Sequence, residues 1–209
     1  MRRETELKSD LAKLFRSQHL VNRAPGCLAA YTFRTLARVP YLKADDAHGD
    51  AREALAILER RGQSIHLLQA LANSSGALRN FARMGNSLRG YTKLPGRYRE
   101  LMILHLSVLH NAPYEWEQHE APARKEGVTQ AELDALKERN LNDLGDHEQK
   151  VLAFAEAALA HKLTDELYAL VRAFLDDEEI TDLTISVAWW GAFVPVIIES
   201  LKIESDAKA

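Results

Sequence analysis

Residues 101–109, LMILHLSVL, constrain this chain most, because seven of the nine are apolar with no polar face among them. Apolar residues on every side of a helical run indicate a helix that is buried all round. Glu100 lies directly before this run, Pro113 interrupts the pattern after it, and Glu115 and His119 follow four residues apart. Titratable groups beside a buried helix are poorly hydrated, which shifts pKa values and makes acid–base chemistry possible.

The rest of the sequence predicts helices and no strands, so we expect an all-α protein. Apolar residues recur at helical spacing, and no segment alternates polar and apolar residues long enough for a strand. Ser64 is a candidate N-cap, Pro95 suits a first helical turn, Thr129 and Glu132 have the spacing of a capping box, and Pro195 predicts a kink. The predicted helices are 4–18, 29–36, 50–61, 64–73, 77–88, 95–110, 112–127, 129–139, 146–161, 164–175 and 178–201.

Composition excludes several classes of protein. A chain of 209 residues with 46% hydrophobic residues can bury one full core. The net charge of −3 argues against a nucleic acid or an anionic membrane as the main partner. No apolar run reaches the roughly 18 residues of a membrane span, and the N-terminus lacks a signal-type apolar core, so we expect a soluble, cytoplasmic protein. Cys27 is the only cysteine, which excludes an intrachain disulfide and favours a small buried side chain over a reactive thiol.

A weak internal repeat relates two parts of the chain. Residues 183–195 align with residues 101–113, and each copy has a buried helix followed by a proline-marked restart. In the second copy Ile197 and Leu201 occupy the places of Glu115 and His119. The polar groups, and any chemistry, should therefore belong to the first copy.

Several motifs together resemble the carboxymuconolactone decarboxylase and alkylhydroperoxidase D-like superfamily. They are the Arg-x-Arg-Glu pattern at 97–100, the buried helix, Tyr-Glu-Trp-x-x-His at 114–119, Ala-Arg-Lys-Glu-Gly at 123–127 and the block 179–190. The resemblance covers residues 38–204 and implies an orthogonal helical bundle with a degenerate repeat, assembled as a closed homo-oligomer, a trimer or hexamer. It leaves residues 1–37 as an N-terminal helical extension and 205–209 as a disordered tail.

The peroxidase branch of this superfamily has a Glu, eleven residues, and then Cys-x-x-Cys-x-x-x-His as proton relay and redox pair. Counting from Glu100 reaches Ala112, Glu115 and His119, so neither cysteine is present. The resemblance carries over Glu100 and His119 as catalytic residues and does not carry over the peroxidatic chemistry.

We therefore predict a cofactor-free lyase or isomerase acting on a small cyclic carboxylic acid or lactone. Glu100, with a raised pKa, would be the acid, His119 its relay or the base, and Glu115 a third member. These three groups could ligate a divalent metal, but no metal-binding spacing supports one and none is predicted. The predicted substrate-contacting residues are Tyr114, Trp116, Arg97 and Arg124.

Each of these residues also has a purely structural interpretation. Glu100 could serve the helix macrodipole, His119 could be a hydrogen-bonded core histidine, and Glu115 could pair with His119 one turn away or close its own helix start. The alternatives for the protein are a catalytically silent helical oligomer that binds a small ligand or partner, and a divergent antioxidant protein.

Overall fold

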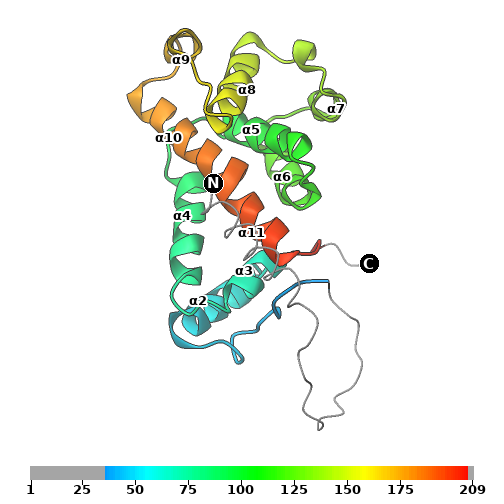
Figure 1. Cartoon of the computed structure of the whole chain (residues 1–209), viewed down its shortest axis with the longest axis vertical. Helices are drawn as coiled ribbons and strands as arrows, with labels where there is room; N and C mark the ends of the chain where they lie inside the picture. Colours follow the sequence, from blue (N-terminus) through cyan, green and yellow to red (C-terminus); the bar gives the residue numbers. More distant parts are fainter. Residues whose placement is uncertain (1–35, 207–209) are drawn as a thin grey trace, which may run out of the picture. The chain divides into compact units, whose positions relative to one another are not determined.

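The computed structural model describes residues 36–206, and this part of the chain contains helices and no strand (Figure 1). The all-α prediction is confirmed. Of the predicted helices, 4–18 lies outside the described residues, as does nearly all of 29–36. The elements are α2 (Gly49–Arg60), α3 (His66–Leu71), α4 (Leu78–Gly90), α5 (Gly96–Leu109), α6 (Pro113–Lys125), α7 (Gln130–Glu138), the 3₁₀ turn η1 (Leu141–Asp143), α8 (Asp146–Leu159), α9 (Asp165–Arg172), α10 (Asp177–Ala188), the π-helical turn η2 (Trp189–Phe193) and α11 (Val194–Leu201).

Helix α5 is the centre of the main hydrophobic core, as its sequence predicts. Leu101, Met102, Ile103 and Leu104 are all at most 1% exposed, and the helix packs against α6, α7, α8 and α10. Burying a side chain of this size stabilises the fold by about 1.5–3 kcal/mol relative to leaving it in water. Because α5 is covered on every side, any polar group on it is shielded from solvent.

A tight turn joins α5 to α6 and sets the position of the candidate site. Asn111 has a φ of 51°, and asparagine is one of the few residues that adopts this left-handed region readily. Pro113 follows in the first turn of α6, where its missing N–H costs nothing. Helix α6 therefore folds back along α5, and His119 comes to lie beside Glu100 although the two are 19 residues apart.

The C-terminal helical segment differs from the prediction of a kink at Pro195. The chain instead makes a π-helical turn just before this proline, in which the N–H of Val194 donates to the carbonyl oxygen of Trp189. Proline has no N–H to donate, and a π turn is one way to absorb such an interruption without breaking a helix. A Cβ at Gly191 would lie 2.5 Å from a methyl carbon of Leu159, so a larger residue here would require the Leu159 side chain on α8 to shift.

The same segment, Asp177–Leu201, corrects two further expectations. It is continuous over 25 residues, so the second copy of the predicted repeat lacks the chain reversal that separates α5 from α6. By length and composition this segment could also cross a membrane, whereas no membrane span was expected from the sequence. Its side chains Ile180, Leu183, Val187 and Trp190 are buried in the main core, which accounts for the apolar composition.

The start of α3 is capped from the other end of the chain. Ser64 was predicted to be the N-cap of this helix, and that prediction is wrong. The N-cap residue is Ile65, whose side chain forms no capping hydrogen bond. The carboxylate of Asp206 accepts from the backbone N–H of His66 at 2.8 Å and from the hydroxyl of Tyr114 at 2.6 Å. Asp206 was expected in a disordered tail, yet these bonds tie it to α3 and α6.

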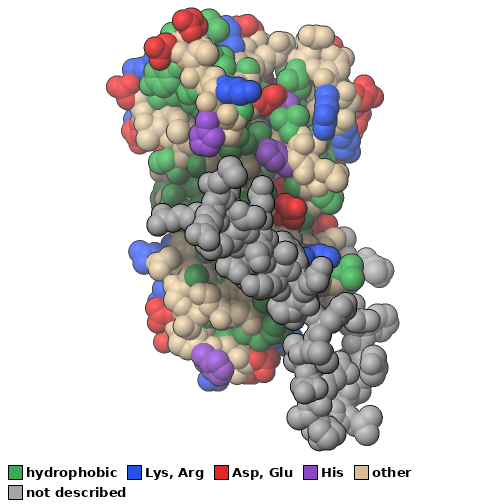
Figure 2. Space-filling view, viewed as in Figure 1, with side chains coloured by type: hydrophobic (Ala, Val, Ile, Leu, Met, Phe, Trp, Pro, Cys, Tyr) green, Lys and Arg blue, Asp and Glu red, His purple; other side chains and the backbone are tan. Residues whose placement is uncertain are grey.

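Acidic and basic side chains are interspersed on the visible part of the face shown in Figure 2, in keeping with the small net charge of −3. This visible part offers no single-sign patch of the kind that binds nucleic acid.

Candidate functional site

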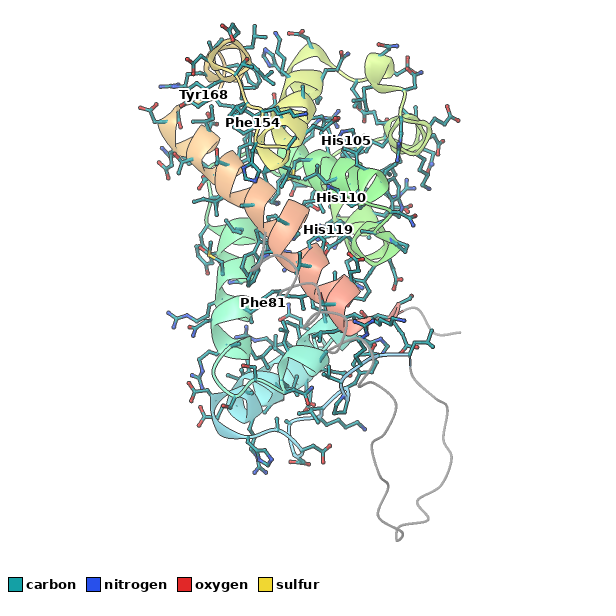
Figure 3. The ribbon with its side chains drawn as sticks, viewed as in Figure 1. Phe81, His105, His110, His119, Phe154 and Tyr168 are labelled. Carbon is teal, nitrogen blue, oxygen red and sulfur yellow. The ribbon has the colours of Figure 1, made fainter. Side chains whose placement is uncertain are left out.

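A cavity of about 540 Å³ lies between α2, α3, α4, α6 and the π-helical turn. Ile57 and Leu58 of α2, Phe81 of α4 and Trp189 contribute apolar walls. His119 and Phe81, which line the cavity from α6 and α4, are labelled in Figure 3 on either side of the C-terminal helical segment. The volume is within the range of small-molecule sites.

Three buried titratable side chains form a line that ends at this cavity. Nδ1 of His119 lies 2.7 Å from Oε2 of Glu100, and its Nε2 lies 3.6 Å from Oε2 of Glu115. Glu100, His119 and Glu115 are 2%, 2% and 4% exposed. His119 and Glu115 line the cavity, and Glu100 lies behind them on α5.

The pKa of Glu100 is lower than that of an ordinary glutamate, the opposite of the predicted direction. Burial by itself would raise this pKa. The hydrogen bond and charge of His119, together with the charge and hydrogen bond of Arg99, lower it by more than burial raises it. Nε of Arg99 donates to Oε1 of Glu100 at 3.1 Å, and both side chains are buried. Glu100 is therefore an ionised acceptor that holds the proton of His119 on Nδ1 and leaves Nε2 facing Glu115.

The pKa of Glu115 is raised, mainly because its carboxyl group is desolvated. The charges of His119 and Arg89 oppose this effect without cancelling it. Oε1 of Glu115 is buried and has no hydrogen-bond partner within the described part of the chain. A carboxyl group with a raised pKa and an unpaired oxygen at a cavity wall is suited to exchange a proton with a bound molecule.

The three side chains do not converge on a common point where a metal ion could be held. Glu100 faces Nδ1 of His119 and Glu115 faces Nε2, so the two carboxylates lie on opposite edges of one imidazole ring. Residues 36–206 contain no cluster of three or more His, Cys, Asp or Glu side chains with metal-binding geometry. The geometry is that of a proton relay rather than of a ligand set.

Arg89 is the cation closest to this end of the cavity. Its guanidinium lies 5.7 Å from the ring centre of Trp190, whose edge meets His119 at 5.8 Å between ring centres. Loss of hydration lowers the pKa of Arg89. The side chain is nevertheless partly open to solvent, and an arginine stays charged at physiological pH even with a lowered pKa. It forms no salt bridge with any described residue, so its charge is available to a bound anion.

Comparison with known proteins agrees with this geometry. The sequence profile of the carboxymuconolactone decarboxylase family matches residues 76–157, which include Glu100, Glu115 and His119. Residues 76–157 are thus similar to the carboxymuconolactone decarboxylase family, in agreement with the resemblance that the sequence motifs indicate. No curated protein matches the sequence significantly.

Several solved structures share the fold of this chain. An uncharacterized peroxidase-related protein with an alkylhydroperoxidase AhpD core, from Ralstonia eutropha JMP134, superposes with a TM-score of 0.71 at 18% identity, covering 84% of this chain and 95% of that one. An uncharacterized peroxidase-related protein from Silicibacter sp. TM1040 gives 0.71 at 17% identity, covering 85% and 96%. A protein of unknown function from Agrobacterium tumefaciens gives 0.59 at 17% identity, covering 66% and 96%. The orthogonal bundle expected from the superfamily resemblance is thus confirmed.

Of the four predicted substrate-contacting residues, one lines the cavity and three lie outside it. Tyr114 lines the cavity, but its hydroxyl is bonded to Asp206. Trp116 lies outside the cavity and donates to Glu120 at 2.7 Å. Arg97 is engaged by Glu132, Glu148 and the carbonyl oxygen of Gly127, and Arg124 by Glu120 and Gln130; neither arginine lines the cavity.

Two arginines of the site were not identified from the sequence. Arg99 lies inside the Arg-x-Arg-Glu motif, but adjacent residues on a helix point about 100° apart, so their contact was not expected. Arg89 belongs to a polar stripe on α4 that continues through Asn86, Arg83 and Arg79 at helical spacing, and all four line the cavity. That spacing was a usable signal, because a polar stripe on a helix with buried neighbours marks a common face.

Proposed function

We propose that this protein is an acid–base enzyme, a lyase or isomerase, that transfers a proton at a carbon next to the carbonyl of a small cyclic carboxylic acid or lactone. The observation that carries the proposal is the buried line from Glu100 through His119 to Glu115, which ends at a cavity beside Arg89. A line of this kind moves protons between defined atoms and needs no redox-active thiol.

In a decarboxylation, the bond from carbon to the departing carboxylate breaks and its electron pair passes into the conjugated carbonyl. The charge that develops is stabilised by Arg89, whose guanidinium is already in place. Glu115 in its acid form then delivers a proton to the carbon and becomes a carboxylate. Its raised pKa favours the return of the carboxylate to the acid form before the next turnover. An isomerisation uses the same group first as base and then as acid.

His119 relays the proton that returns Glu115 to its acid form: Nε2 takes the proton from solvent water in the cavity, which makes the ring an imidazolium, and then passes it to the Glu115 carboxylate. The Nδ1–H of His119 is held by the ionised Glu100, so Nε2 is the nitrogen that exchanges protons with Glu115. The present 3.6 Å separation is longer than a hydrogen bond, and such contacts commonly tighten when substrate binds. The negative charge of Glu100, itself fixed by Arg99, stabilises the imidazolium that forms during transfer.

The peroxidase-related descriptions of two structural neighbours do not favour a thiol peroxidase here. The two positions that hold cysteines in the peroxidase branch are Ala112 and Glu115 in this chain. We therefore assign Glu115 the role of proton carrier at the place of a redox thiol.

Solvent proton exchange tests the proposal without knowledge of the final product. Candidate cyclic keto acids and lactones are incubated with the protein in D₂O, and deuterium incorporation at the carbon next to the carbonyl is followed by NMR. Glu100→Gln, His119→Gln and Glu115→Gln should each lower the rate by roughly 10²–10⁴-fold, the usual worth of a positioned acid or base. The Glu100→Gln/His119→Gln double variant should be little slower than either single variant, because groups that act as a unit are not additive.

Glu120→Gln is the matched control, since Glu120 lies on the same helix but outside the cavity and pairs with Arg124. It should exchange at the wild-type rate. Normal rates in all three site variants on a substrate that the wild type turns over would refute the proposal.

A further inference from the structure

The cavity is much longer than a small cyclic acid needs. Its walls include Arg79 and Arg89, ten residues apart on α4, so it follows that helix for about 15 Å. Its volume of about 540 Å³ equals that of roughly 18 water molecules at about 30 Å³ each. A single ring with one carboxylate at Arg89 would leave most of this space to water.

The two ends of the cavity differ in chemistry. One end holds Arg89, Glu115 and His119, with the unpaired Oε1 of Glu115 at the wall. Apolar side chains of α2 and α3, among them Ile57 and Leu68, line the part of the cavity where Glu53 of α2 binds Arg79. We call this second part the apolar arm, and define it by Ala54, Ile57, Leu58 and Leu68.

Charge along the cavity is also unequal. Arg79, near the apolar arm, donates to Glu53 at 2.7 Å and lies 3.7 Å from Asp50, so its charge is compensated within the protein. Arg89 forms no ion pair within residues 36–206. Arg61 and Arg83 also line the cavity without an ion pair in that range, but Arg89 is the one that lies beside Glu115 and Trp190. An anionic group at the reacting end therefore gains most from Arg89, and an apolar group gains most in the arm.

From these features we infer that the cavity binds an amphipathic monocarboxylic acid, with its carboxylate on Arg89 and an extended apolar body in the apolar arm. This orientation places the carbon next to the carboxylate at Glu115, where the proposed proton transfer takes place. The inference rests on the proposed function for the identity of the reacting end, and it extends the substrate class from a compact ring to an elongated acid. Arg89 is its specificity-determining residue.

Calorimetric titration of the full-length protein with straight-chain acids tests the inference. Butyrate, hexanoate and octanoate should bind with affinity that rises about fourfold for each added methylene, the worth of transferring one such group from water. Octylamine should bind at least tenfold more weakly than octanoate, because its cation meets Arg89. Equal binding of the three acids, or of the amine and the acid, would overturn the inference.

Three variants locate the two ends of the bound chain. Arg89→Gln should weaken octanoate at least tenfold and leave octanol unchanged, whereas Arg52→Gln, which changes an exposed arginine of α2 outside the cavity, should change octanoate affinity less than threefold. Ile57→Glu places a charge in the arm at a side chain that is 41% exposed, so the fold should tolerate it. It should weaken octanoate at least tenfold and leave butyrate within twofold of wild type; an equal loss for both acids would show that no arm is used.

Binding and catalysis fail separately in this design. Glu115→Gln should retain octanoate binding, because Gln keeps the volume of the site and removes a negative charge. Chain-length-dependent binding without any proton exchange by the wild type would refute the proposed function and uphold the binding mode. Proton exchange restricted to compact ring acids would uphold the proposed function and refute the binding mode.

Discussion

Replacing Glu115 by glutamine should stabilise the protein at neutral pH while it removes activity. The folded-state pKa of Glu115 is raised above its ordinary value of 4.5, so the folded protein holds this proton more tightly than the unfolded chain does. The contribution of Glu115 to the free energy of unfolding is therefore greatest below pH 4.5 and is lost as the pH rises through the folded-state pKa. Glutamine does not titrate, and the variant should avoid that loss.

The size of the effect follows from burial. Glu115 is 4% exposed, so its ionised form loses hydration in the fold, and one pKa unit corresponds to about 1.4 kcal/mol once the group is ionised. We expect the variant to be more stable than wild type by at least about 1 kcal/mol near pH 7, which corresponds to roughly 2–4 °C in the thermal midpoint. Near pH 4 the two midpoints should coincide.

Thermal unfolding followed by circular dichroism from about pH 4 to pH 8, at one protein concentration, measures this difference. Glu120→Gln on the same helix should leave the midpoint nearly unchanged, since exposed ion pairs contribute little. Glu100→Gln should act with the opposite sign, because its pKa is lowered and its stabilisation is present at neutral pH and lost in acid. A Glu115→Gln protein several degrees less stable than wild type at pH 7 would show that Glu115 is a structural group and refute the reasoning.

Three further outcomes are expected. We predict a closed homo-oligomer, a trimer or hexamer, from the superfamily resemblance and from the exposed side chains of Phe193 and Val196, at 52% and 61%. Phe193→Asp should lower the mass measured by light scattering, and a single-chain mass for the wild type at micromolar concentration would contradict the prediction. Cys27→Ser should leave all activity intact, because one cysteine has no resolving partner; thiol-dependent peroxide reduction abolished by this change would refute the assignment. Gly191→Ala should lower the thermal midpoint by several degrees through its clash with Leu159, an overpacking cost of about 1–3 kcal/mol, and an unchanged midpoint would show that α8 yields easily.

The helices were predictable from the sequence where local chemistry decides them. The all-apolar run of α5, Pro113 in the first turn of α6, and the Thr129 and Glu132 capping box each act over a few residues, and each is present in the structure. Features that depend on distant partners were not predictable. Asp206 caps α3 across 140 residues, and the close contact of Gly191 with Leu159 of α8 joins residues 32 positions apart.

The roles of the two glutamates show the same limit in the candidate site. The superfamily spacing indicated that Glu100, Glu115 and His119 lie together, because spacing along two packed helices determines distance. It did not distinguish an acid from an ionised acceptor, because two glutamates have the same intrinsic pKa and only their surroundings separate them. Glu100 has Arg99 and His119 as partners and lies behind the cavity, whereas one oxygen of Glu115 has no partner among residues 36–206 and Glu115 lies at the cavity wall. The proposal of Glu115 as proton donor therefore depends on the surroundings of each carboxyl group, which include residues far apart in the sequence.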